Sequence, residues 1–267
     1  MKTLFIVGGS SGIGYETCSL FLKAGYRVIN VSRSPCSLDG VENIPCDITV
    51  REKLDEVLSA VKTERIDCFV YSAGFSMAAP LEYVLEGDYR YLFEVNFFAY
   101  LHCLQTLIPS LRRSNGVATA VSSLAAVAPV PFDCYYTASK AALNAFTETL
   151  NYELEQDGIR VYSVMPCGTK TDFTKKRKVY PPASVDGYSH KMTLATDKLA
   201  KTEQNGSSAA SVAKTVFLAC TQPPRTSVLS APVSSKFVCF FVKLLPLRLK
   251  QALIKYFYFM ETNDDVT

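Results

Sequence analysis

Residues 4–14 read Leu-Phe-Ile-Val-Gly-Gly-Ser-Ser-Gly-Ile-Gly, and this stretch decides the fold that we expect for the whole chain. Its four apolar residues are too few for a helix and are typical of a strand buried on both faces. After the glycines, apolar residues continue at helical spacing as far as Leu22, and Gly25 then ends the helix. The stretch therefore predicts a strand, a tight turn and a helix in direct succession.

The turn between this strand and this helix has the features of a phosphate site. A helix N-terminus presents free backbone N–H groups and about half a positive charge, which attract phosphate. Gly8 permits the tight turn, Gly12 lets the backbone approach a pyrophosphate, and Gly14 lets the helix pack close to the strand. An ordinary glycine-rich turn is the alternative, but the position between strand and helix favours nucleotide binding.

The composition is that of one large domain with a well-filled core. The chain has 267 residues, of which 48% are hydrophobic, and its formal net charge is +3. A charge this small does not argue for nucleic acid as a partner. We therefore expect a single α/β domain over residues 1–267.

The cysteines, the histidines and the apolar runs set further limits. The nine cysteines are dispersed without a Cys-x-x-Cys pair, which indicates reduced thiols in a cytoplasmic protein rather than disulfides or a zinc site. With only His102 and His190, no metal centre is expected. The apolar run at residues 4–7 is too short for a signal peptide, and no run reaches the ~18 apolar residues of a membrane span.

Short apolar runs alternate with amphipathic segments along the rest of the chain. The pattern predicts further strands at residues 27–31, 41–46, 68–71, 116–121 and 159–164, and helices at 51–61, 88–111, 136–155 and 208–219. Such alternation is typical of a Rossmann-type, doubly wound parallel sheet with helices on both faces.

The end of the second predicted strand bears on the choice of nucleotide. An acidic residue near this point usually receives the adenosine ribose hydroxyls of NAD, but this chain has Ser32 followed by Arg33. A guanidinium can bind a 2′-phosphate through two hydrogen bonds, whereas a carboxylate would repel it. An arginine on the surface without this role is the alternative. The pair favours NADP(H) over NAD(H).

A tyrosine and a lysine at the start of the predicted helix 136–155 are candidate catalytic residues. Tyr136 and Lys140 are four residues apart and so point to one helical face, whereas Tyr135 points elsewhere. Such a pair alone carries little weight, because about one is expected by chance in this composition. Ser123, at a strand end, and Asn96, inside the predicted helix 88–111, add to it. An asparagine inside a helix is locally unfavourable and calls for a tertiary partner.

The spacing Gly-x-x-x-Gly-x-Gly, together with these four polar residues, resembles the short-chain dehydrogenase/reductase family over about residues 3–220. The resemblance implies an oxidoreductase in which Tyr136 exchanges a proton with the substrate and Ser123 binds the substrate oxygen. It implies that Lys140 lowers the pKa of the tyrosine and binds the nicotinamide ribose, and that Asn96 holds a water beside Lys140. A buried amide satisfied by the protein itself is the alternative for Asn96.

The resemblance also implies a set of cofactor contacts. Asp47 is expected either at the adenine ring or as the N-cap of the predicted helix 51–61. The chain departs from the family pattern at Val7, Ser72 and Cys167, where threonine, asparagine and glycine are usual. The expected cofactor-binding residues are Gly8, Ser10, Ser11, Gly12, Ile13, Gly14, Ser32, Arg33, Asp47, Ile48, Ser72, Ala73, Gly74, Tyr136, Lys140, Pro166, Thr169 and Thr171.

Two segments near the end of the chain concern the substrate and partners. Residues 173–206 are polar, are expected to be irregular, and stand where the family has a mobile substrate lid; the basic run 175–178 reads as a solvated face. Residues 236–260 are rich in Phe, Leu and Tyr, with basic residues interleaved. A helix after Pro246 would carry an apolar stripe, and three roles are open for it: packing over the substrate cleft, lying on a membrane surface, or forming a dimer contact. The stripe consists of Leu249, Leu253, Tyr256, Phe257 and Met260.

The apolar loop 124–132 and this tail predict a cleft for a small lipophilic substrate, lined by Leu124, Val127, Val130 and Phe132. The order of segments is similar to the 17β-hydroxysteroid-dehydrogenase-like branch of the family, which implies a hydroxysteroid, including bile-acid-type steroids, as the substrate. An acyl-dihydroxyacetone phosphate, a 3-oxoacyl thioester or a retinoid is the alternative. A sensor that binds NADP(H) without turnover is a remote alternative, and the family resemblance implies a homodimer or homotetramer.

Overall fold

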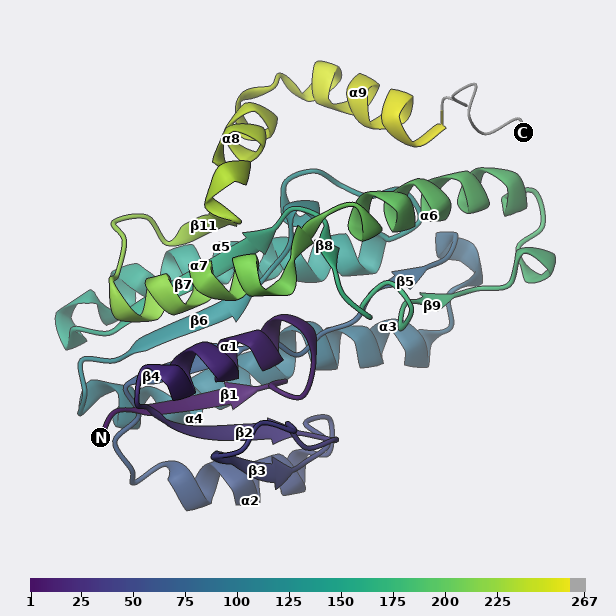
Figure 1. The fold of residues 1–267 in the computed structure, drawn as a ribbon. Coiled ribbons are helices and arrows are strands. Elements are labelled where there is room, and N and C mark those ends of the chain that lie inside the picture. Colours follow the sequence, from purple (N-terminus) through teal and green to yellow (C-terminus); the bar gives the residue numbers. More distant parts are fainter. Residues whose placement is uncertain (260–267) are drawn as a thin grey trace.

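The computed structural model describes residues 1–259, which form one seven-stranded parallel sheet with helices on both faces (Figure 1). The strand order is β11-β7-β6-β4-β1-β2-β3, and every neighbouring pair is parallel. The strands of this sheet are β1 (Thr3–Val7), β2 (Arg27–Ser32), β3 (Val41–Pro45), β4 (Cys68–Tyr71), β6 (Val117–Val121), β7 (Arg160–Pro166) and β11 (Val228–Ala231).

The helices pack on the sheet in two layers. The first and seventh cover one face and pack against each other, while the second, fourth and fifth cover the other face (Figure 1). The helices are α1 (Gly12–Lys23), α2 (Arg51–Val61), α3 (Glu86–Phe93), α4 (Ala99–Arg112), α5 (Cys134–Leu154), α6 (Ser189–Gln204), α7 (Ala209–Thr221), α8 (Lys236–Leu244) and α9 (Leu247–Phe259). The doubly wound α/β fold expected from the sequence is confirmed.

Strand β1 supplies side chains to both layers, which explains its uninterrupted apolar sequence. Leu4 and Ile6 lie in the cluster under α1 and α7, whereas Phe5 and Val7 lie in the cluster under α2, α4 and α5. All four are 0–1% exposed. The strand is therefore held at the centre of the sheet, and its carboxyl end, where the glycine turn begins, is fixed from both sides.

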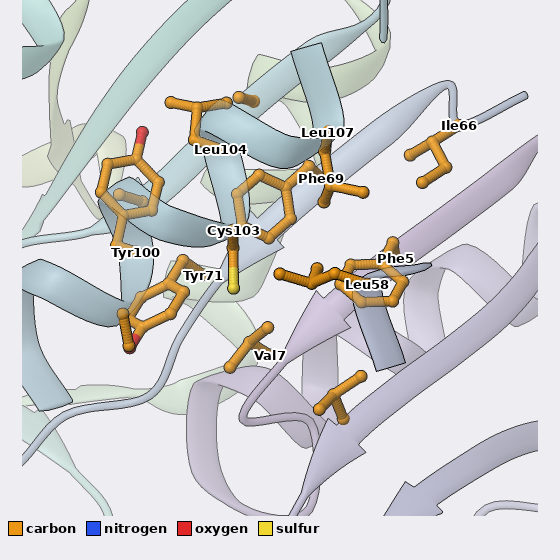
Figure 2. Close-up of a cluster of buried hydrophobic side chains, with 14 of the residues drawn as sticks. Phe5, Val7, Leu58, Ile66, Phe69, Tyr71, Tyr100, Cys103, Leu104 and Leu107 are labelled. Carbon is orange, nitrogen blue, oxygen red and sulfur yellow. The ribbon is translucent and has the colours of Figure 1, made fainter. Parts of the chain in front are cut away.

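Aromatic side chains join β4 to the long helical segment behind it. The ring of Tyr100 on α4 stacks on Phe69 at 6.0 Å between centroids and contacts Tyr71 at 5.4 Å (Figure 2). The Tyr71 hydroxyl donates a hydrogen bond of 2.5 Å to the carbonyl of Val95. These contacts fix the helical turn that carries Asn96.

The helix predicted at residues 88–111 is not regular. It consists of α3, a π-helical turn over Glu94–Phe98, and α4. A π-turn inserts an extra residue, so the apolar side rotates between the two halves. Tyr91 and Phe98, which a regular helix with the spacing of this segment would bury, are 40% and 49% exposed, whereas Leu92 is fully buried.

The six strands predicted from the sequence are all present, each within two residues of the predicted bounds, but three longer elements and several two-residue strands were missed. Strand β11 is short, and only Ala231 in it is buried. Helix α6 lies in the segment expected to be irregular; its buried side chains are Met192 and Ala195 alone, too few for a recognisable apolar stripe. Helix α8 precedes the predicted tail helix. Of that predicted stripe, Met260 lies outside the described residues.

The segment expected to be a lid is tied to the body by two short parallel ladders. Strand β9 (Lys178–Val179) pairs with β5 (Met77–Ala78), and β10 (Ser207–Ser208) pairs with β8 (Thr169–Lys170). Helix α6 lies between these ladders in the chain and packs against α9. The segment therefore has defined structure at both ends.

Candidate active site

The glycine turn after β1 has no room for side chains. A Cβ on Gly14 would lie 2.0 Å from the Gly8 carbonyl oxygen, and one on Gly8 would lie 2.6 Å from the Ala73 nitrogen. Gly12, in contrast, has a φ of +55° and faces only the side chain of Thr171, at 3.5 Å or more. The glycine turn is thus packed tightly against the sheet at Gly8 and Gly14 and open at Gly12, as phosphate binding at a helix N-terminus requires.

Asn30 fixes this turn and was missed by the sequence analysis. It is 1% exposed in β2, and its Oδ1 accepts a hydrogen bond of 2.8 Å from the Gly9 nitrogen. Its Nδ2 donates to the Ser32 hydroxyl at 2.8 Å and to Asn43 Oδ1 at 2.9 Å. An amide inside the apolar run of β2 was the available signal, because a buried polar group needs partners. Asn30 holds the turn through the backbone of Gly9, in a chain whose Val7 stands where the family usually has a threonine.

A cavity of about 570 Å³ lies along the carboxyl ends of β1, β2, β4, β6 and β7. Nearly all of the expected cofactor-binding residues line it; Gly14 lies behind the turn instead. Ser123 lines the cavity as well. The lining residues among those expected are Gly8, Ser10, Ser11, Gly12, Ile13, Ser32, Arg33, Asp47, Ile48, Ser72, Ala73, Gly74, Tyr136, Lys140, Pro166, Thr169 and Thr171.

Ser32, Arg33 and Asp47 form one end of this cavity. Arg33 is exposed at its edge. Asp47 Oδ1 accepts hydrogen bonds from the nitrogen and hydroxyl of Thr49, at 3.0 and 2.7 Å. Burial acts to raise the pKa of Asp47, but these hydrogen bonds and the charge of Arg33 outweigh it, so the pKa is lowered. The N-cap of α2 is Val50, so the N-cap alternative for Asp47 is wrong.

Tyr136, Lys140 and Ser123 meet at the other end. Tyr136 and Lys140 lie one turn apart on α5, and the Lys140 ammonium is 5.7 Å from the centroid of the tyrosine ring. It donates a hydrogen bond of 2.8 Å to the carbonyl of Val121, the last residue of β6. Ser123 follows two residues later, and its hydroxyl accepts from the Ala125 nitrogen at 3.1 Å. The strand end and the helix start therefore bring all three polar groups together.

Burial controls the protonation of this triad. It lowers the pKa of Lys140 to about 8, because it disfavours the charged ammonium. Burial raises the pKa of the Tyr136 phenol well above its usual range, although a hydrogen bond with Ser123 opposes the shift. In the protein without a bound ligand, Tyr136 is therefore a protonated phenol near neutral pH.

Asn96 lies behind the cavity wall and is fully hydrogen-bonded by the protein. Its Oδ1 accepts from the Phe75 nitrogen at 3.0 Å, and its Nδ2 donates to the Phe75 carbonyl at 2.9 Å and to the Ser139 hydroxyl at 3.1 Å. A Cβ on Gly74 would lie 3.2 Å from Asn96 Oδ1 and 3.3 Å from Lys140 Nζ. Asn96 is thus a satisfied amide beside the lysine, and the water between them stays a prediction.

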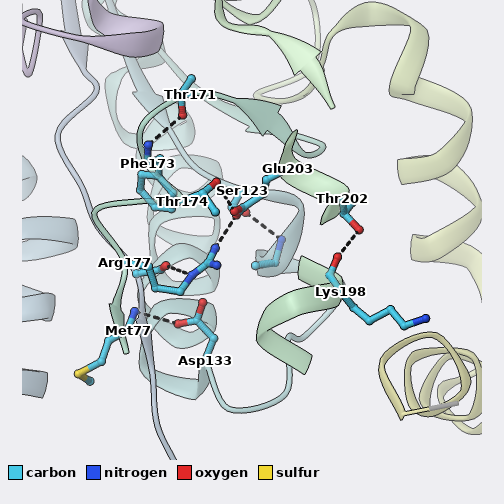
Figure 3. A network of polar contacts seen from close by, with 12 residues as sticks. Met77, Ser123, Asp133, Thr171, Phe173, Thr174, Arg177, Lys198, Thr202 and Glu203 are labelled. Atoms are coloured by element: carbon cyan, nitrogen blue, oxygen red, sulfur yellow. Dashed lines mark hydrogen bonds and ion pairs between the residues drawn. The ribbon is translucent and has the colours of Figure 1, made fainter. Parts of the chain in front are cut away.

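A buried charged cluster lies next to Tyr136 and was missed by the sequence analysis. It contains Asp133, Arg177 and Glu203 (Figure 3). The Arg177 guanidinium is 2.6 Å from Glu203 Oε1 and donates to the Ser76 hydroxyl at 2.8 Å. Its side chain is 3% exposed, so the expectation that run 175–178 is a solvated face is wrong at this residue. We call these three residues the charged cluster.

The carboxylates of the charged cluster have distinct surroundings. Glu203 lines the cavity, and its second oxygen accepts from the Thr174 hydroxyl at 2.6 Å. Asp133 is 2% exposed and accepts from the Met77 nitrogen at 3.3 Å. Burial raises the pKa of Asp133 to about 7 against the opposing charge of Arg177. The position of Asp133, three residues before Tyr136, was the only signal of the cluster in the sequence.

The apolar wall of the cavity comes from other residues than expected. Phe75, Tyr91, Val95 and Phe173 line it, and the ring of Phe173 lies 5.9 Å from that of Tyr136. Within the described chain, no residue of loop 124–132 lines this cavity, so that part of the prediction is wrong. The loop instead contacts α9, where the ring of Phe132 lies 6.3 Å from that of Phe259.

Cys167, which replaces the usual glycine, reaches the tail. Its sulfur is 3.2 Å from that of Cys239 on α8. The hydrogen bond between them raises the pKa of Cys167 and lowers that of Cys239 to about 6. The residue after Pro166 is therefore engaged with α8 and does not face the cavity as a free thiol.

The residues present fit a nicotinamide dinucleotide. The open helix N-terminus at Gly12 suits the pyrophosphate. Thr169 also lines the cavity, and its Oγ1 is buried and has no hydrogen-bond partner within residues 1–259. A buried hydroxyl without a partner is costly, and an amide group in the cavity would satisfy it.

Comparisons with known proteins agree with this geometry. The family model for short chain dehydrogenases matches residues 2–180. A 3-ketodihydrosphingosine reductase of Bacteroides thetaiotaomicron is 26% identical over 212 residues, which cover 77% of this chain and 78% of that protein. Estradiol 17-beta-dehydrogenase 2 of Mus musculus is 28% identical over 196 residues, which cover 67% of this chain and 51% of that protein. A short-chain dehydrogenase structure from Streptomyces avermitilis has a TM-score of 0.76, with 24% identity and 96% and 94% coverage.

Proposed function

Because the chain belongs to the short-chain dehydrogenase family, we propose that it is an oxidoreductase that uses NADP(H) to interconvert a secondary alcohol and a ketone on a lipophilic substrate. The observation that carries this proposal is the meeting of Ser123, Tyr136 and Lys140 at one end of a cavity whose other part is the glycine turn. A sensor without turnover would not need a buried phenol and a buried amine side by side.

In the proposed reaction, a bound nicotinamide supplies or accepts the hydride. Ser123 holds the substrate oxygen beside the Tyr136 hydroxyl, and Tyr136 gives its proton to that oxygen as the ketone is reduced. The raised pKa of Tyr136 keeps the proton available near neutral pH. The Lys140 ammonium, 5.7 Å from the ring, stabilises the phenolate that forms as the proton leaves.

The preference for NADP(H) rests on Ser32 and Arg33. The Ser32 hydroxyl donates to the Ser34 carbonyl at 2.7 Å, so it shapes the loop that presents Arg33 at the edge of the cavity. The carboxylate of Asp47 nearby is engaged by Thr49. A guanidinium at this edge supports binding of a 2′-phosphate.

For the substrate we propose a hydroxysteroid, including bile-acid-type steroids. The aromatic wall formed by Phe75, Tyr91 and Phe173 beside Tyr136 supports a flat, apolar ring system. The mouse relative named as an estradiol 17-beta-dehydrogenase supports the same class.

A long-chain lipid ketone is the second candidate, and Glu203 favours it. This carboxylate lines the cavity close to the apolar wall, so the same site suits a substrate with an apolar chain and a polar head. The Bacteroides relative named as a 3-ketodihydrosphingosine reductase supports it. The 3-oxoacyl, acyl-dihydroxyacetone phosphate and retinoid substrates are the remaining alternatives, and a relative named as a 3-oxoacyl-[acyl-carrier-protein] reductase supports the first of them.

The test is a panel of steroid ketones, 3-keto lipids, 3-oxoacyl thioesters and retinal, each offered with NADPH and with NADH. Oxidation of the cofactor, followed by its absorbance, should be fastest with steroid ketones and NADPH. A purified Tyr136→Phe protein serves as the control for contaminating activity. Turnover confined to 3-keto lipids would replace the first candidate by the second, and no turnover of any substrate would contradict the proposed reaction.

A further inference from the structure

Helices α8 and α9 form an arm that extends away from the sheet (Figure 1), and its exposed side chains are largely apolar. Ten large apolar side chains on these two helices are between 47% and 75% exposed. Soluble monomers seldom expose so many neighbouring apolar groups, and larger patches mark interaction sites. We call this the tail surface; it consists of Phe237, Val238, Phe240, Phe241, Leu244, Leu247, Leu249, Leu253, Tyr256 and Phe257.

The charge of the tail surface has one sign. Between residues 236 and 259 the sequence has five basic residues and no Asp or Glu. Lys250 is the most enclosed of them, since its ammonium donates to the Val127 carbonyl at 3.3 Å. The other four are exposed, so the apolar side chains are bordered by positive charge. The exposed basic residues are Lys236, Lys243, Arg248 and Lys255.

The inner side of α9 lies near the charged cluster beside Tyr136. Helix α9 packs on α6, and Tyr258, at 9% exposure, points inward. Burial raises the pKa of Tyr258 to about 12, and the carboxylates of Asp133 and Glu203 add to the shift. The same two carboxylates act on Tyr136. One helix thus has its inner face near the charged cluster and its outer face in the tail surface.

We propose that the tail surface docks on the headgroup region of an anionic lipid bilayer, so that a cytoplasmic enzyme meets its lipophilic substrate at the membrane. Apolar side chains bordered by basic ones are what such a surface binds. Within residues 1–259, no helix is long and apolar enough to cross a bilayer. The role in substrate delivery rests on the proposed function, whereas the docking itself does not.

The charge favours a lipid surface over a second copy of the chain. A symmetric dimer through the tail surface would bring two sets of basic residues together, without an acidic residue in the stretch to pair with them. Like charges placed face to face destabilise such a contact. Anionic headgroups supply the missing negative charge.

The test is co-sedimentation of the full-length protein with phosphatidylcholine vesicles, with and without 30% phosphatidylglycerol, in the absence of substrate and cofactor. Binding should be at least about tenfold tighter to the anionic vesicles, because each basic residue near such a surface contributes about 1 kcal/mol. This preference should diminish at high salt. Equal binding to both vesicles, or binding to neither, would overturn the proposal even if the enzyme reduces ketones as proposed.

Two double variants with matched controls locate the binding. Phe240→Ser with Phe241→Ser removes exposed apolar groups and should weaken vesicle binding at least about tenfold. Tyr152→Ser removes an 82% exposed aromatic from α5 and should change nothing. Both proteins should keep the melting temperature of the wild type, since neither loses a buried contact.

Lys243→Glu with Arg248→Glu should abolish the preference for anionic vesicles. Lys53→Glu with Lys214→Glu makes the same change in charge on α2 and α7, and should weaken binding far less. Analytical ultracentrifugation tests whether a second copy of the chain binds the tail surface instead. A dimer that the two serine substitutions dissociate, together with unchanged vesicle binding by that variant, would assign the tail surface to a second copy instead.

Discussion

Arg177 and Glu203 are joined by an ion pair of 2.6 Å, which ties the chain just before β9 to the end of α6 beside Tyr136. Both side chains are largely enclosed, at 3% and 13% exposure. A guanidinium in this position also faces the buried carboxyl of Asp133. The Arg177 guanidinium therefore compensates the negative charge of the carboxylates at this end of the cavity.

Arg177→Met should destabilise the protein by about 3–5 kcal/mol, because it leaves buried carboxylates without their cation. The free energy of unfolding from urea titration measures the loss. Glu203→Gln is the matched control, since it keeps hydrogen-bonding capacity and removes a negative charge, and it should cost less. An Arg177→Met protein as stable as the wild type would contradict the role of the pair.

The buried carboxyl of Asp133 should make stability depend on pH. Its pKa is raised from 3.8 to about 7, so between these values the folded protein retains a proton that the unfolded chain has lost. Stability should therefore fall as the pH rises from about 4 to about 7 and level off above.

Asp133→Asn should remove this decline, because the amide oxygen can still accept from Met77 but does not titrate. The measurement is the difference in unfolding free energy between wild type and variant at intervals from pH 4 to pH 8. With about 1.4 kcal/mol per pKa unit, the difference should change by a few kcal/mol over this range. A constant difference would show that Asp133 does not titrate there.

Tyr136→Phe should lower kcat by at least about a thousandfold, because general acid–base catalysis contributes on the order of 10²–10⁴ and Ser123 would lose its partner. The Kd for NADPH, measured by fluorescence, should change by less than about threefold. Tyr135→Phe is the control; that ring stacks on Tyr89 at 4.9 Å and should be dispensable for catalysis. Retained activity in Tyr136→Phe would show that Tyr136 is not the general acid.

Arg33→Ala should raise the KM for NADPH about tenfold to a hundredfold, the range expected for a hydrogen bond to a charged group, and leave the KM for NADH nearly unchanged. Arg160→Ala provides the matched control, because this exposed arginine begins β7, whereas the cavity lies at the carboxyl ends of the strands. Equal effects on the two cofactors would refute a contact with the 2′-phosphate.

The parts predicted from the sequence are those that local pattern determines. Strands such as Cys68–Tyr71 are buried on both faces and read as apolar runs, and the family spacing located Ser123, Tyr136 and Lys140. The glycine turn was recognised for the same reason. Asn30, however, acts through tertiary hydrogen bonds to the turn, which no local pattern encodes.

The parts that could not be predicted depend on contacts between distant segments. Arg177 and Glu203 are 26 residues apart, and their burial follows from the packing of α6 and β9, so a basic run gave no sign of it. The loop 124–132 reads as a cleft wall because it is apolar, but its Val130 packs in the apolar cluster that contains Tyr136 and its Phe132 contacts α9. Composition alone does not show which neighbour buries such a loop.

The direction in which the Asn96 side chain points depends on the number of residues in the π-turn over Glu94–Phe98 as well as on the residue type. Deleting one residue from this turn would let the segment form a regular α-helix, and the side chains within the turn, Asn96 among them, would take other directions relative to α3 and α4. The amide would then face away from Phe75 and Ser139, although no atom of Asn96 had been altered. A length change of a single residue would thus break the hydrogen bonds of Asn96 to Phe75 and Ser139 as a mutation of the asparagine itself would.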